Sequence, residues 1–134
     1  MHEMVMRIME PDLCYIFARN ARRKGHPELA LQAHRRAVDL KAQEHGPTSD
    51  AELNALRAIY AYEEALSHSK GKRTRATGTW QMVNRHGVLP AIARRLRARD
   101  SGDMLGTLRE LGMEDYSFQA VIEKYPDAFA DIAA

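Results

Sequence analysis

The side chains of this sequence that could bind a ligand gather in one stretch, Ser69 to Arg99. This stretch holds nine Lys and Arg residues, the chain's only Trp, and no Asp or Glu. Cations pair with phosphate groups or carboxylates, whereas a surface that only keeps a protein soluble usually mixes both signs of charge. The stretch therefore favours binding to nucleic acid or to an acidic protein surface over a plain solvated face.

Charge is divided unevenly along the 134 residues, although the net charge is only +2. Residues 1–64 carry a charge of −1, residues 65–99 carry +9 and residues 100–134 carry −6. A basic segment beside an acidic one indicates an electrostatic partner. That partner could be a nucleic acid or an acidic protein. The acidic C-terminal segment could also fold back on the basic one, in the same chain or in a second copy.

The second half of the basic stretch has the spacing of an amphipathic helix over residues 89–99. Apolar residues at i, i+3, i+4 and i+7 predict its buried side, made by Leu89, Ile92, Ala93 and Leu96. The opposite side is predicted to present arginines between small residues, namely Ala91, Arg94, Arg95 and Ala98. Arginine binds phosphate through a fork or reads guanine through two hydrogen bonds, so this side could enter a groove.

The preceding segment supplies the other candidate contacts. A loop expected over Ser67 to Gly78 would place cations on a phosphate backbone or in a minor groove. A short helix over residues 80–86 would turn amide and guanidinium groups outward. The candidate nucleic-acid-binding residues are thus Lys70, Lys72, Arg73, Arg75, Gln81, Asn84, Arg85, Arg94, Arg95, Arg97 and Arg99.

Thr79 to Arg99 resembles a DNA-binding helix-turn-helix. Gly87 lies where the turn falls, and apolar residues lie where such motifs pack their helices together, at Met82, Val88, Ala93 and Leu96. His86 and Val83 depart from the pattern, which usually has an apolar and a small residue at these positions. The resemblance implies binding to duplex DNA by occupancy rather than catalysis. It also implies a homodimer, since one short helix gives little specificity alone.

Helical periodicity along the rest of the chain predicts an all-α fold, a compact bundle of about six to seven short helices in one domain. Residues 1–67 are expected to form a helical scaffold, 68–99 the basic loop with the helix-turn-helix-like unit, and 100–134 the acidic C-terminal helices. Ser49 and Glu52 have the spacing of a capping box. A short first helix is expected before the break at Glu10-Pro11, followed by helices over residues 11–24, 26–45, 49–67, 80–86, 89–99, 104–111 and 117–125. In the helix over residues 11–24, the expected inward residues are Leu13, Ile16, Phe17 and Ala21.

No pattern in the sequence indicates an enzyme. The six His residues have no paired-ligand spacing and no phosphate-binding glycine loop is present, so neither a metal nor a cofactor is expected. The pair Glu63 and Glu64 could join Asp100 and Asp103 in binding Mg²⁺, as a nuclease requires. These acids are more simply explained as exposed charges on helix surfaces. Trp80 is expected to belong to the core rather than to stack on a base.

The single cysteine, Cys14, excludes an internal disulfide and fits a reducing, cytoplasmic setting. No uncharged apolar run approaches the roughly 18 residues that a membrane span needs, and the N-terminal segment is a poor signal peptide. We therefore expect a small cytoplasmic protein of bacterial or phage type that binds nucleic acid, DNA rather than RNA. The alternative is a helical protein–protein interaction module, an adaptor or inhibitor. Its basic face would dock an acidic partner or its own acidic tail.

Overall fold

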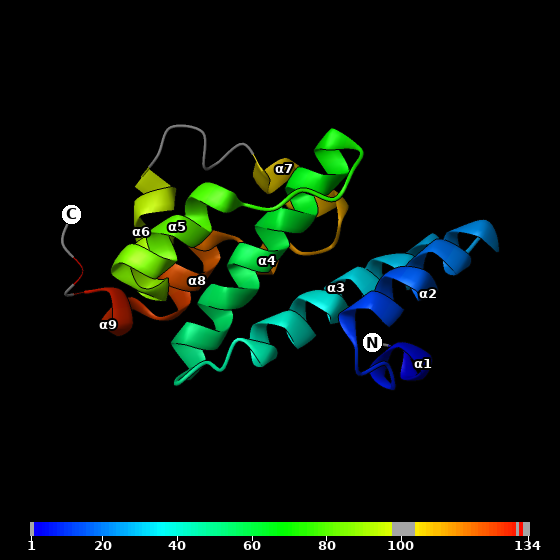
Figure 1. The fold of residues 1–134 in the computed structure, drawn as a ribbon, viewed down its shortest axis with the longest axis horizontal. Helices are drawn as coiled ribbons and strands as arrows, with labels where there is room; N and C mark the ends of the chain where they lie inside the picture. Colours follow the sequence, from blue (N-terminus) through cyan, green and yellow to red (C-terminus); the bar gives the residue numbers. More distant parts are fainter. Residues whose placement is uncertain (1, 98–103, 131, 133–134) are drawn as a thin grey trace. The chain divides into compact units, whose positions relative to one another are not determined.

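The computed structural model describes residues 2–97, 104–130 and 132, and these residues form helices and connecting turns without any strand (Figure 1). The predicted all-α fold is confirmed. Within the described residues no helix is long and apolar enough to cross a membrane. The elements are α1 (Glu3–Met6), α2 (Pro11–Arg23), α3 (Pro27–Glu44), α4 (Asp50–Lys70), α5 (Thr77–His86), α6 (Val88–Arg97), α7 (Leu105–Glu110), the 3-10 helix η2 (Glu114–Tyr116), α8 (Phe118–Lys124) and α9 (Pro126–Phe129).

Contacts along the chain group into two compact units, Met1–Gly46 and Pro47–Ala134. The boundary falls at the Gly-Pro break after α3, where proline cannot continue a helix. Each unit is described by itself. That the whole chain forms one domain stays a prediction.

The first unit is a hairpin of α2 and α3, with the short helix α1 packed against α3. Both long helices carry proline in their first turn, where the missing N–H has no helical partner to lose. Their interface is built from small side chains, since Ala18 and Ala21 of α2 are buried together with Ala30 and Ala33 of α3. Alanine allows two helix backbones to approach closely.

The alanine interface leaves larger apolar side chains of the first unit in solvent. Leu13 is 48 % exposed and Ile16 is 45 % exposed. The prediction that these two residues face inward is wrong for this reason, because α2 packs through its alanine face instead. Met4, Met6 and Met9 are also more than half exposed.

The second unit is organised around α4, which contacts α6, α7, α8 and η2. The helix begins as the capping box predicts, with the Ser49 hydroxyl accepting from the Glu52 N–H at 3.1 Å. It ends at Lys70 rather than near Ser67, because Gly71 takes a left-handed conformation with φ of 72° and closes the last turn there.

The core of the second unit joins α4 to the C-terminal helices. Its buried residues are Ala55, Ala58, Ile59, Val83, Ala91, Ile92, Phe118, Val121 and Phe129. Ile92 is inward as predicted, but Ala91 is also fully buried, which contradicts its predicted place on the presented side of α6. The helix is covered from several directions, by α5 as well as by α4, α8 and α9, so its buried stripe is wider than a simple projection allows.

Two glycines of the second unit should respond in opposite directions to replacement by alanine. Gly87 has φ of 95° and ψ of 167°, a region that L residues avoid, so G87A should destabilise by about 1–3 kcal/mol. Gly78 lies in the first turn of α5, where an added Cβ would meet nothing within 4 Å, so G78A should stabilise by up to about 1 kcal/mol. Urea unfolding of both variants measures the difference, and a G87A protein as stable as the parent would contradict this conformation.

Cys14 should be an inert thiol in the folded protein. Burial raises its pKa from the ordinary 9.0 to about 11, with Arg36 and Lys41 acting weakly in the opposite direction. At pH 8 only about one thiol in a thousand is then ionised, so a thiol reagent should react slowly until denaturant is added. The unfolded chain loses this proton near pH 9 and the folded chain near pH 11. The free energy of unfolding should therefore fall across that window, and the step should be missing in C14A.

Candidate nucleic-acid interface

Two neighbouring glutamates of α4 lie inside the second unit. Glu63 is 5 % exposed and Glu64 is 4 % exposed, so the prediction that they are surface charges is wrong. An ionised carboxylate is buried only where charges or hydrogen-bond donors compensate it. Donors come from the segment that follows α4, namely the basic loop of residues 71–76 and Trp80 of α5.

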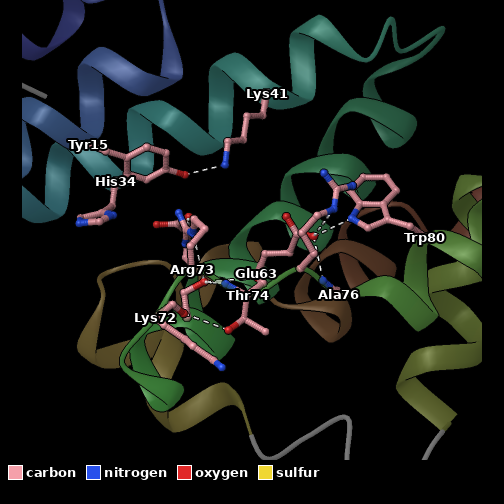
Figure 2. A network of polar contacts seen from close by, with 12 residues as sticks. Tyr15, His34, Lys41, Glu63, Lys72, Arg73, Thr74, Ala76 and Trp80 are labelled. Carbon is pink, nitrogen blue, oxygen red and sulfur yellow. Dashed lines mark hydrogen bonds and ion pairs between the residues drawn. The ribbon is translucent and has the colours of Figure 1, made fainter.

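Glu63 ties down the end of the basic loop and the start of α5. Its Oε2 accepts the Ala76 N–H at 2.8 Å and the Trp80 indole N–H at 2.7 Å, and the Arg75 Nε lies 4.0 Å away. Figure 2 shows Ala76 and Trp80 beside the Glu63 carboxylate. One buried acceptor thus serves both a backbone donor and a side-chain donor of the following segment.

Glu64 holds the middle of the same loop through Arg73, whose guanidinium lies 2.8 Å from the Glu64 Oε2. The Ser67 hydroxyl adds a second attachment on α4, since it accepts the Thr74 N–H at 2.9 Å and the Arg73 Nε–H at 3.2 Å. The Thr74 hydroxyl donates to the Lys72 carbonyl at 2.9 Å (Figure 2). The loop is therefore fastened to α4 from Arg73 to Ala76.

Trp80 is half-buried and packs against the core of the second unit. Its ring centroid lies 4.9 Å from that of Tyr60, and the Arg75 guanidinium lies 5.8 Å from it on the loop side. The indole N–H thus donates to Glu63, while the ring contacts Tyr60 and Arg75. This is the environment of a structural Trp.

The loop cations differ in how far they reach solvent. The Arg73 and Arg75 side chains are 45 % and 70 % exposed while interacting with the two glutamates. Lys70, at the end of α4, and Lys72, in the loop, are exposed.

On α5, the predicted contacts Gln81, Asn84 and Arg85 are all exposed. Their i, i+3 and i+4 spacing puts them on one face of the helix. The connection from α5 to α6 consists of Gly87 alone, which is shorter than the three or four residues that join the helices of a DNA-binding helix-turn-helix.

On α6, Arg94 and Arg97 are exposed and share a face. Arg95 is half-buried, and its guanidinium donates to the Tyr62 hydroxyl at 2.7 Å and lies 5.2 Å from the centre of that ring. Arg95 therefore interacts with α4 rather than pointing away from the core as predicted. Arg99 lies outside the residues that the structure describes.

The first turn of α6 consists of the apolar residues Val88, Leu89 and Pro90, which are half-buried. A recognition helix reads base edges with exposed polar residues of its N-terminal half. The cations of α6 lie instead in its last turn. This arrangement suits contacts to phosphate groups better than contacts to base edges.

In the described part of the chain, no three His, Cys, Asp or Glu side chains lie close enough together to hold a metal ion. Comparison with protein-family models, curated proteins and solved structures gives no significant match to this chain. The fold and the surface define an all-α protein whose basic loop is held to α4 by two buried glutamates, Glu63 and Glu64.

Proposed function

We propose that this protein binds the phosphate backbone of duplex nucleic acid, DNA rather than RNA, through residues 70–97. One observation carries the proposal: seven of the eight cations described in this segment are exposed, and the segment contains no carboxylate. Neutralising phosphates with such cations releases condensed counterions and drives binding without base recognition. The exposed cations are Lys70, Lys72, Arg73, Arg75, Arg85, Arg94 and Arg97.

A duplex is favoured over a single strand because single-strand binding depends on aromatic platforms on which bases stack. Trp80 is the only Phe, Tyr or Trp between residues 63 and 115. Its indole N–H donates to Glu63, and its ring lies next to Tyr60 and Arg75. The basic segment thus offers cations but no free aromatic surface.

The protein would act by occupancy, with little sequence preference, because the exposed side chains suit phosphate contacts. A cytoplasmic location in a bacterium or phage fits this role and the single cysteine. A homodimer would double the number of phosphates that one particle can contact.

The proposal predicts a steep dependence of affinity on salt. For a short mixed-sequence DNA duplex, the slope of log K against log salt should flatten by about 1.8 in the double variant R94A/R97A, because two phosphate contacts are lost. Fluorescence anisotropy between about 50 and 200 mM salt measures this slope. The matched control is R19A/R23A, which removes two exposed charges from α2 and should leave the slope unchanged.

Two results of this titration would count against the proposal. If R19A/R23A flattened the salt slope as much as R94A/R97A, net charge rather than this surface would account for the interaction. An absence of binding to both DNA and RNA duplexes at low salt would end it. Tighter binding to the RNA duplex would reverse only the preference for DNA.

The second candidate function is a protein–protein interaction module. It is favoured by the exposed apolar residues of the first unit, which fall within one short stretch and comprise Met4, Met6, Met9, Leu13 and Ile16. Surfaces that contact other proteins are rich in exposed apolar side chains, and methionine adapts to partners of varied shape. In this function the basic segment would dock an acidic protein or the acidic C-terminal segment.

The double variant L13S/I16S tests whether the exposed apolar residues of the first unit join two copies of the chain. Both side chains are about half exposed, so the melting temperature should change little. If the first unit contacts a second copy of the chain, sedimentation velocity should report an oligomer in the parent protein and a monomer in the variant. A monomeric parent at all concentrations would remove the homodimer from consideration.

A further inference from the structure

We infer that the arginine and the lysine at the centre of the basic loop have different tasks in binding a duplex. Arg73 is a positioning residue that fixes the loop to α4, and Lys72 is the residue that contacts a phosphate group. This inference rests on the proposed function and deepens it. It makes the loop a surface that is fixed to α4 before binding, rather than a mobile arm.

The position of Arg73 is set by a buried partner. The Glu64 side chain is only 3 % exposed, and the Arg73 guanidinium lies 2.8 Å from its Oε2. The Nε–H of the same guanidinium donates to the Ser67 hydroxyl at 3.2 Å. Moving Arg73 onto a phosphate would take this cation away from a buried carboxylate, which is costly in a protein interior. Arg73 therefore stays on α4 when the surface is occupied.

Lys72 has the opposite arrangement. Its carbonyl is held by the Thr74 hydroxyl at 2.9 Å, while its side chain is exposed. Figure 2 shows the Lys72 and Arg73 side chains leaving the loop in different directions, and it is the Arg73 guanidinium that lies 2.8 Å from the Glu64 Oε2. Lysine presents a compact charge with three donors, which suits a single phosphate group.

The loop cannot extend as a minor-groove arm without breaking its attachments. Its end is held by the Glu63 carboxylate through the Ala76 N–H, and its middle by Ser67 through the Thr74 N–H. A surface fixed before binding loses less conformational entropy when it binds. Phosphates recur at regular spacing along a duplex. A surface fixed in advance therefore fits the backbone of a duplex better than it fits a flexible single strand.

The test compares two variants that each remove one cation from adjacent positions, K72A and R73A. In titrations with the mixed-sequence DNA duplex, K72A should flatten the salt slope by about 0.9, the value for one phosphate contact. Its melting temperature should not change. R73A should leave the slope unchanged, lower the melting temperature and shift the emission of Trp80, the only Trp in the chain. R73K, which retains a cation for Glu64, should restore much of the lost stability.

The opposite pattern overturns the inference. An R73A slope as flat as that of K72A would mean that Arg73 itself contacts phosphate, and an unchanged K72A slope would remove Lys72 from the contact. If no duplex binds, the proposed function fails together with the role of Lys72. The positioning role of Arg73 is then decided separately, because melting temperature and Trp80 emission of R73A and E64Q need no nucleic acid. Both variants behaving like the parent would overturn it.

Discussion

The basic surface depends on the burial of two adjacent carboxylates in α4. Glu63 and Glu64 are nearly inaccessible to solvent, and each is compensated by groups from the segment that immediately follows the helix. The partners lie between 9 and 17 positions away along the chain, so closing the loop between them costs little entropy. A run of cations that would repel one another on a free chain is thereby ordered against the protein.

The helices were largely predictable because their signals are local. Proline in the first turn and the Ser49 cap mark the starts of α2, α3 and α4, and Gly87 marks the break before α6. The burial of Glu63 and Glu64 is a different kind of fact, because it depends on donors supplied by a later segment. A signal for it was present: the two acids interrupt an apolar helix directly before a 35-residue window that contains nine bases and no acid.

Periodicity identified apolar residues but could not decide which helix face would be used. In α2 the alanine face packs against α3 and leaves Leu13 and Ile16 exposed, because close approach of the two helices requires small side chains. In α6 the helix is covered from more than one direction, which buries Ala91. Arg95 is drawn toward α4 by the Tyr62 hydroxyl and ring, a partner 33 positions earlier that no local pattern indicates.

The charge of a segment and its capacity to contact a ligand are therefore separate quantities. Every cation between residues 70 and 97 contributes to the positive field that would attract a polyanion from a distance. Contact with a polyanion would be restricted to side chains that can leave the protein surface without exposing a buried group. Arg73 and Arg95 are held by Glu64 and Tyr62. The two buried glutamates reduce the positive field, yet they hold Arg73 and Arg75 and thereby fix the loop that carries Lys72. The loop thereby gains an ordered geometry, which is the property that recognition of a regular backbone would require.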